Sequence, residues 1–586
     1  MIHYRVEPDD LHTHHWRVTL SVPQPAAEQL VSLPVWIAGS YMVREFGRHL
    51  SGLQARQGVR PLAVQALDKT TWRVRCSGRA ALTLSYRVYA FDASVRGAFL
   101  DSARGFFNNT ALCLRVHGRE AQPHRLSLGT LPAGWQVATA MPPAAGGGAR
   151  AFEAASYDEL LDHPFELGSF WRGRFDAGGV PHELVVTGAL PGFDGERLLA
   201  DTCRICEQQI AFWHAPDHSR PPFARYVFLL HAVEDGYGGL EHRASTALVA
   251  ARRDLPRSGT AAASDGYVTL LGLISHEYFH TWNVKRLKPA DLAEPDHRHE
   301  NHTRLLWFFE GFTSYYDELM LRRCGLIDGP RYLRLLAKTV NAVAATPGRR
   351  VQSVAEASFD AWVKYYRSDE NTPNATVSYY QKGALVALAL DLTLRQRGGS
   401  LDEVMHRLWR RSGAAGDVAT GGAVTEADIA AVLVDVAGQP MDDALRDWVH
   451  GTGELPLAEL LPAFGVSWRS EPAGFAASLG LRLSEGPVSG VQIKSVLVGS
   501  AAAAAGLSAG DELLAIDGWR IRRLDDALAW VAPPQAFDLL LVRDQRVLTL
   551  TVRPDARSPL ASTVSLQLQD KPQRGVAARR RAWIGA

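Results

Sequence analysis

Cysteine is scarce in this chain of 586 residues, which has five in all. They are Cys76, Cys113, Cys203, Cys206 and Cys324. An odd and widely spaced set does not make a disulfide framework. The single C-x-x-C pair, at 203 and 206, has no second pair to complete a cysteine metal site. We therefore expect buried or inert thiols, and neither a disulfide-stabilised fold nor a cysteine-based metal centre.

An excess of charge of either sign is also missing. Lys and Arg number 63 and Asp and Glu 62, so the net charge is +1, which argues against nucleic-acid binding over the whole surface. The basic run at 579–581 is too short to change this expectation. No apolar stretch approaches the ~20 residues needed to cross a bilayer, so we expect no membrane partner. Residues 1–7 lack the basic start and apolar run of a secretory signal, which makes a cytoplasmic location the expectation.

The length exceeds what one hydrophobic core can hold and predicts three or four domains. Residues 1–165 show period-two alternation, for example at 16–22, 71–75 and 82–88, which indicates an antiparallel β-sandwich. Residues 166–465 begin with strands around a helix at 196–214 and become mostly helical. Residues 470–555 read as short strands joined by turns, and 556–586 as a tail. The fold class expected is multidomain α+β.

Function is indicated most strongly by His276-Glu277-Tyr278-Phe279-His280, a match to H-E-x-x-H. On a helix, residues four apart share one face, so both imidazoles can bind one metal ion. Two nitrogen ligands beside a carboxylate suit Zn²⁺, and Glu277 can act as the base toward a water molecule. The apolar residues at 270–274 predict that this helix is buried. Asp265 precedes the helix and fits an N-cap.

A catalytic zinc needs a third protein ligand, and Glu310 is the candidate. It interrupts the apolar run at 306–313, where a buried carboxylate is unfavourable unless it is paired or bound to a metal. We therefore expect one Zn²⁺ per chain on His276, His280 and Glu310.

Glycines before the zinc helix mark a possible ligand-facing backbone. Gly238 and Gly239 precede Glu241, and consecutive glycines let a backbone come close to a ligand. A plain tight turn is the alternative. The loops at 33–41 and 94–101, rich in aromatic residues and arginine, either face the active site or merely connect the sheets.

Several of these segments resemble the M61 family of glycyl aminopeptidases, which are gluzincin metallopeptidases. The resemblance is carried by residues 276–287, 307–313, 238–242 and 379–383, by Trp36, Gly39-Ser40-Tyr41 and Ser94-Val95-Arg96, and by a PDZ-like unit with Ala505-Gly506-Leu507. It implies a thermolysin-like catalytic domain between a β domain and a PDZ module. The peptide-binding loop of that module would be 479–483, open to a peptide or protein C-terminus.

The resemblance also implies residue roles. Tyr380 matches the tyrosine that stabilises the transition state in the related M1 aminopeptidases, with Tyr379 as the competing choice. Glu241 matches the glutamate that holds the substrate amine, beside Gly238 and Gly239, although His242 stands where M1 enzymes have Asn. Asp317 matches an acid that could accept the outer N–H of His280 or His276.

The function expected is therefore a zinc aminopeptidase that releases small N-terminal residues, Gly or Ala, from peptides with a free N-terminus. An endopeptidase on the same zinc site is one alternative. An inactive PDZ-bearing peptide-binding scaffold is the other, and the complete set of ligands, base and tyrosine argues against it.

Overall fold

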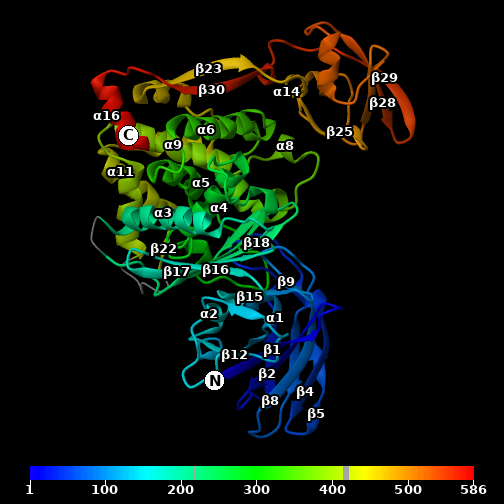
Figure 1. Ribbon diagram of the computed structural model, residues 1–586, viewed down its shortest axis with the longest axis vertical. Helices are drawn as coiled ribbons and strands as arrows, with labels where there is room; N and C mark the ends of the chain where they lie inside the picture. The colour runs from blue at the N-terminus through cyan, green and yellow to red at the C-terminus, as the bar shows by residue number, and fades with distance from the viewer. Residues whose placement is uncertain (216–218, 414–420, 586) are drawn as a thin grey trace. The chain divides into compact units, whose positions relative to one another are not determined.

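The computed structural model describes residues 1–215, 219–413 and 421–585 (Figure 1). The chain divides into two compact units, Met1–Asn301 with Trp409–Val424, and His302–Leu408 with Thr425–Ala586. Among the described residues, no helix combines the length and the apolar character needed to cross a membrane.

The first unit begins with the β domain that the alternation predicts. In β2 (His15–Val22), buried Trp16, Val18 and Leu20 alternate with more exposed neighbours. One sheet runs in the order β14-β12-β1-β2-β8-β4-β5. Its other strands are β1 (Ile2–Asp10), β4 (Leu50–Gln57), β5 (Arg60–Leu62), β8 (Leu82–Tyr89), β12 (His124–Leu128) and β14 (Ala151–Ala154). The pair β1 and β12 is parallel, whereas the other pairs of this sheet are antiparallel.

Two further sheets pack against the same hydrophobic core. One has the order β13-β15-β10-β9 and the other β11-β3-β7-β6. Their strands are β3 (Glu28–Ser32), β6 (Val64–Ala66), β7 (Thr71–Arg75), β9 (Ala98–Leu100), β10 (Arg104–Asn108), β11 (Arg115–Val116), β13 (Gln136–Ala138) and β15 (Pro164–Gly168). Short helices α1 (Asn109–Leu112) and α2 (Tyr157–Leu161) follow β10 and β14.

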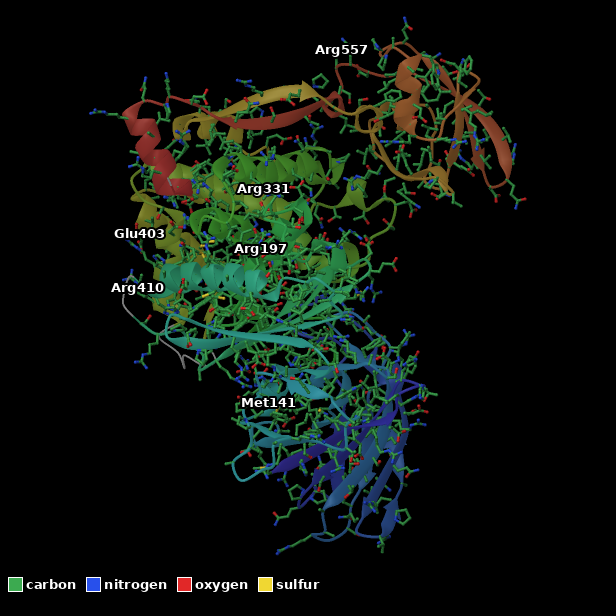
Figure 2. All side chains as sticks on the ribbon, viewed as in Figure 1. Met141, Arg197, Arg331, Glu403, Arg410 and Arg557 are labelled. Carbon is green, nitrogen blue, oxygen red and sulfur yellow. The ribbon has the colours of Figure 1, made fainter. Side chains whose placement is uncertain are left out.

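A mixed sheet with helices follows in the same unit. Its order is β16-β17-β18-β20-β19, which places β19 at an edge. The strands are β16 (Trp171–Ala177), β17 (Val180–Thr187), β18 (Tyr226–Val233), β19 (Tyr237–Glu241) and β20 (Ser245–Ala251). Helix α3 (Gly195–His214) contacts β16, and α4 (Asp265–Phe279) contacts α3, β19 and β20. Arg197 belongs to α3 (Figure 2). Its guanidinium lies 5.0 Å from the centre of the Tyr267 ring of α4.

One alternative is excluded here, and one local expectation is wrong. The glycines at 238 and 239 lie in the edge strand β19, which excludes the alternative of a plain tight turn. Ser264, and not Asp265, is the N-cap of α4, because its hydroxyl accepts the Tyr267 N–H at 3.0 Å. Asp265 is the first helical residue, where a negative charge favours the helix dipole.

The second unit is helical over most of its first part, as expected. Its helices are α5 (Leu306–Arg323), α6 (Gly329–Ala344), α7 (Val354–Phe359), α8 (Thr372–Ala375), α9 (Gln381–Gln396), α10 (Leu401–Leu408), α11 (Glu426–Ala437), α12 (Asp442–Leu445) and α13 (Leu457–Leu460). Helices α5 and α9 touch backbone to backbone, since a Cβ on Gly311 would lie 2.6 Å from the Gly383 Cα. The apolar helix expected from Thr376 starts at Gln381, and the capping box at Thr425 is present. In the sequence, β22 (Gly422–Val424) falls between α10 and α11, but it belongs to the first unit. There it pairs with β21 (Leu287–Pro289).

The PDZ-like segment has a core of its own. Its sheet order is β24-β25-β26-β28-β29, with β27 beside β26. The elements are α14 (Phe475–Leu479), β24 (Leu481–Gly486), β25 (Gly490–Val496), α15 (Ala501–Ala504), β26 (Glu512–Ile516), β27 (Trp519–Arg520), β28 (Phe537–Arg543) and β29 (Arg546–Val552).

The segment expected to be a tail is folded. Strand β30 (Ser562–Leu568) pairs with β23 (Val466–Pro472), and α16 (Arg574–Ile584) follows. Trp583 is 0% exposed, and its indole N–H donates to the Tyr315 hydroxyl at 2.9 Å. The basic run at 579–581 concealed this helix in the sequence, because its apolar anchor is confined to the last turn.

Candidate active site

The His pair stands at the end of α4, a helix held in place by buried apolar side chains such as Leu271 and Ile274. His276 is in the last turn, and the His280 backbone N–H donates to the His276 carbonyl at 3.2 Å. This geometry turns both rings to one side. Their Nε2 atoms lie 3.0 Å apart, with the ring planes at 87°.

The tautomer of His280 follows from its second nitrogen. Nδ1 lies 2.8 Å from the backbone carbonyl of Asn283. A carbonyl oxygen only accepts hydrogen bonds, so Nδ1 carries the proton and Nε2 keeps its lone pair for a metal. The expectation that Asp317 accepts this N–H is therefore wrong for His280 and stays a prediction for His276. Asp317 itself accepts the Glu318 backbone N–H at 2.5 Å.

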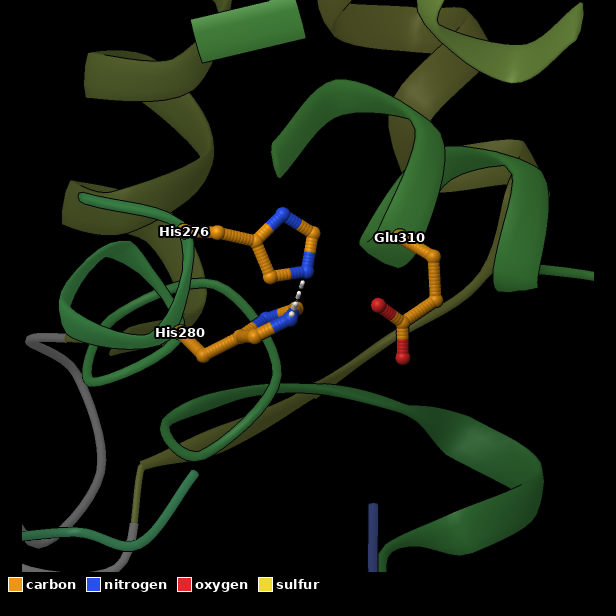
Figure 3. Close-up of side chains that lie close together, drawn as sticks. All are labelled: His276, His280 and Glu310. Carbon is orange, nitrogen blue, oxygen red and sulfur yellow. Dashed lines mark hydrogen bonds between the residues drawn. The ribbon is translucent and has the colours of Figure 1, made fainter. Parts of the chain in front are cut away.

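Glu310 comes from the first turns of α5, where it is 2% exposed among aromatic residues. Its carboxylate and the nitrogens of His276 and His280 all lie within 4.8 Å of one another (Figure 3). A tetrahedral zinc with bonds of about 2.0 Å holds nitrogen ligands about 3.3 Å apart. The donor set of two imidazoles and one buried carboxylate therefore fits zinc in both chemistry and spacing.

Glu277 is 5% exposed and lies against the edge strand β19. A Cβ added to Gly239 would be 2.1 Å from the Glu277 Oε1 atom. The absent side chain is what lets the glutamate carboxylate rest on the strand backbone. The approach of a ligand to Gly238 and Gly239 stays a prediction, and the contact between Gly239 and Glu277 was not expected from the sequence.

Glu241 ends the same strand and is 4% exposed. Gly39, from the N-terminal β domain, lies directly against it, since a Cβ on Gly39 would be 2.5 Å from both carboxylate oxygens. Gly39 has φ of +91°, a conformation that favours glycine. A cavity of about 90 Å³ beside Glu241 is lined by Trp36, Tyr41 and other residues. The loop at 33–41 thus faces this glutamate, and its facing the active site stays a prediction that depends on the role of Glu241.

Arg96 also reaches β19 from the β domain. Its Nη2 donates to the Gly239 carbonyl at 3.1 Å, and its Nη1 lies 3.5 Å from the position of a Cβ on Gly238. Sequence reasoning singled out the loop around Arg96 but gave the guanidinium no role. The only signal in the sequence for a role of this guanidinium is the aromatic and arginine content of the loop at 94–101.

Tyr380 precedes α9, and its hydroxyl lies 3.3 Å from that of Tyr366. Burial raises the pKa of Tyr380 well above its usual value, and the charge of Glu310 adds to this rise, so the hydroxyl keeps its proton as a donor. Tyr379 stacks on it with ring centres 4.7 Å apart and is 0% exposed, whereas Tyr380 is partly accessible. Its accessibility and its proximity to Glu310 favour Tyr380 over Tyr379 as the tyrosine that could contact a substrate.

Comparison with known proteins agrees with this geometry. A model of the Peptidase M61 N-terminal domain matches residues 3–169, and a model described as M61 glycyl aminopeptidase matches residues 269–386. The crystal structure of an aminopeptidase N family protein from Idiomarina loihiensis is 36% identical over 100% of both chains, with a TM-score of 0.92. The chain belongs to the M61 glycyl aminopeptidase family. It is thus a metallopeptidase of the aminopeptidase type, as predicted.

The M61 assignment also confirms the expected fold class, and a PDZ domain model matches residues 471–531. An M1 zinc metallopeptidase from Deinococcus radiodurans, a mutant bound to a Tyr-ser-ala substrate, is 14% identical over 78% of this chain and 95% of that chain, with a TM-score of 0.47. Aminopeptidase A of Legionella pneumophila is 12% identical over 98% of this chain and 60% of that chain, with a TM-score of 0.46. A comparison with curated protein sequences gave no match.

Proposed function

We propose that this M61 enzyme removes small N-terminal residues, glycine or alanine, from peptides with one zinc ion held by His276, His280 and Glu310. The observation that carries the proposal is the convergence of these three side chains within 4.8 Å. Zinc bound there would supply Lewis acidity, which acidifies water to a pKa of about 7 and polarises a peptide carbonyl.

Glu277 is the proposed general base. Its carboxylate is buried and lies against Gly239 in β19. It takes the proton of the attacking water and passes it to the amine that leaves when the peptide bond breaks. A base fixed in this way loses little entropy when the substrate arrives.

Tyr380 is the proposed donor to the carbonyl oxygen as negative charge develops there. Its raised pKa keeps the proton on the hydroxyl at neutral pH, which a donor needs. Electrostatic stabilisation of this kind acts most strongly where water is excluded.

Glu241 is the proposed partner of the substrate ammonium, through a charge-assisted hydrogen bond. It follows Gly239 by two residues on the same strand, so an amine at Glu241 places the first peptide bond near Glu277. This spacing supports release of one residue at a time.

The preference for small residues is supported by the crowding around Glu241. The backbone at Gly39 fills one side of the carboxylate, and the adjoining cavity measures about 90 Å³. The description of the family as glycyl aminopeptidase points in the same direction.

For the PDZ domain we propose binding of a peptide or protein C-terminus. In the predicted binding segment 479–483, only Gly480, with φ of +76°, separates α14 from β24. Strand β24 stands at the end of the sheet order, where an added peptide strand can pair. A peptide with a free C-terminus should bind more tightly than its amide. Equal affinities in calorimetry would refute this assignment.

The zinc aminopeptidase proposal is tested with alanine arylamide and its N-acetylated form. We expect the wild type to cleave the free amine and to leave the blocked substrate intact. Replacement of Glu241 by Ala should raise KM for the free amine sharply. Equal cleavage of both substrates would show an endopeptidase instead.

The role of Glu277 is tested by Glu277→Gln, which should abolish turnover while one zinc stays bound. Glu207→Gln, an exposed residue of α3, is the matched control and should keep wild-type activity. An active Glu277→Gln protein would refute the general-base role, and a wild type without bound metal would refute the zinc site.

A further inference from the structure

Arg96 is held rigidly by its own loop. The side-chain amide of buried Asn108 donates to the Val95 carbonyl at 2.8 Å, and the Arg96 backbone N–H donates to the Ser94 hydroxyl at 3.2 Å. Ser94 is fixed in turn by its backbone N–H, which donates to Asp92 at 2.9 Å. On the other side of Arg96, the Asn108 backbone N–H donates to the Gly97 carbonyl at 3.1 Å, so hydrogen bonds hold the backbone both before and after this residue.

The guanidinium lies along the two glycines of β19. One nitrogen donates to the Gly239 carbonyl, and Nη1 lies over the open face of Gly238. Its Nε is buried and has no hydrogen-bond partner, and none of the ion pairs among the described residues includes Arg96. A cation without a protein carboxylate, beside bare backbone at a sheet edge, is suited to bind the carboxylate of a ligand.

The direction of the substrate along β19 follows from two glutamates. Glu241 marks the proposed place of the amine, and Glu277, against Gly239, marks the bond that is cut. The chain beyond that bond must therefore continue toward Gly238, which is where Arg96 lies.

The lengths also agree. In an extended dipeptide the terminal carboxyl carbon lies one residue, about 3.3–3.6 Å, beyond the peptide bond that is cut. Gly238 is likewise one residue, about 3.3 Å along the strand, beyond Gly239. A dipeptide whose scissile bond lies at Gly239 thus places its carboxylate near Gly238, beside the Nη1 atom of Arg96.

We propose that Arg96 is a specificity-determining residue that binds the C-terminal carboxylate of dipeptide substrates. The inference rests on the proposed aminopeptidase function and names its substrate class. The enzyme then favours short peptides whose second residue ends in a free carboxylate, and a longer peptide loses this ion pair.

The test compares Ala-Ala with Ala-Ala amide, which differ only in the charge of the C-terminus. For the wild type we expect kcat/KM to be about 10- to 100-fold higher for the acid, the range that a charge-assisted pair with arginine supports. In Arg96→Gln the ratio of acid to amide should fall to near one, and in Arg96→Lys it should be intermediate, because lysine keeps the charge without the planar fork. Arg48→Gln, an exposed arginine of the same domain, should keep the wild-type ratio.

The ratio separates recognition from a structural role. If Arg96→Gln lowers both rates and keeps the wild-type ratio, Arg96 only supports β19 and the inference is wrong. Equal wild-type kcat/KM values for Ala-Ala and Ala-Ala amide would also overturn the inference. That comparison needs no variant, and its failure would leave the aminopeptidase function intact. A wild type that cleaves neither peptide nor alanine arylamide would overturn both proposals.

Discussion

At the scale of single residues, two glycines hold the glutamates of the site in place. Gly239 faces Glu277 and Gly39 faces Glu241, each at a distance that admits no side chain. The backbone at each glycine therefore limits where the neighbouring carboxylate can lie. An active site built in this way should be sensitive to the smallest substitution at either glycine.

Gly239→Ala tests this at Glu277. The new Cβ would be 2.1 Å from the carboxylate oxygen, so the base must move. A displacement of about 1 Å costs about 10²-fold in rate, and we expect kcat to fall by at least that factor while the bound zinc is retained. Gly272→Ala in α4, where a Cβ meets open space, is the control and should keep the wild-type kcat. Wild-type kcat in Gly239→Ala would contradict the positioning role of this contact.

The choice between the adjacent tyrosines is also decided by single substitutions. Tyr380→Phe should lower kcat by about 10²–10³, the loss typical of one donor to a developing oxyanion. Tyr379→Phe should have a much smaller effect, because that side chain is fully buried. Steady-state kinetics on alanine arylamide measure both, and the reverse order would reassign the role.

At the scale of elements, α16 is a structural part of the second unit. Trp583 is 0% exposed and is anchored through its indole N–H to Tyr315 of α5. Truncating a buried tryptophan typically costs 3–5 kcal/mol, so Trp583→Ala should reduce the free energy of unfolding by about that amount. Chemical denaturation measures it, with Trp519→Ala, 67% exposed, as the control. Equal stability of the two variants would mean that α16 contributes little.

The end of α5 and the start of α10 are joined by an ion-pair network that responds to pH. Burial alone would raise the pKa of Asp402, but the Arg323 and Arg395 guanidinium groups outweigh it and lower the pKa to about 2. An aspartate in the unfolded chain has a pKa of about 3.9. Because the folded pKa is the lower one, the stabilisation is complete above about pH 5 and is lost as pH falls toward 2.

Asp402→Asn should therefore be less stable than the wild type at pH 7, and the difference should shrink steadily between pH 5 and pH 3. Urea unfolding of both proteins across this range, with chelator present throughout, provides the measurement. A difference that stays constant with pH would show that the carboxylate is not the source of the stabilisation.

Local sequence patterns could predict the elements but not the contacts between them. The spacing of His276 and His280 is a property of one helix, so the sequence predicts it. Glu310 is predictable because a carboxylate in an apolar run is unfavourable unless it is paired or bound to a metal. Gly39 and Arg96 act on β19 from the N-terminal β domain, and nothing in their neighbours reveals that partner. The helix α16 was missed because its one large apolar anchor, Trp583, stands at the far end of a basic segment.

At the scale of the whole molecule, the family shows a metallopeptidase with a PDZ domain, and the site residues supply the proposed chemistry. The N-terminal β domain is more than a support, since Gly39 and Arg96 both contact the strand that the substrate is proposed to follow. The proposed selection of substrate is thus shared between Glu241 on β19 and the N-terminal β domain.

The central claim is that one zinc ion binds His276, His280 and Glu310. Anomalous diffraction recorded on both sides of the zinc absorption edge tests it most directly, on crystals of the purified enzyme. The account predicts one zinc peak per chain, about 2.0–2.2 Å from the Nε2 atoms of both histidines and from a carboxylate oxygen of Glu310. A fully active enzyme with no zinc peak there, or with zinc bound only elsewhere, would contradict it.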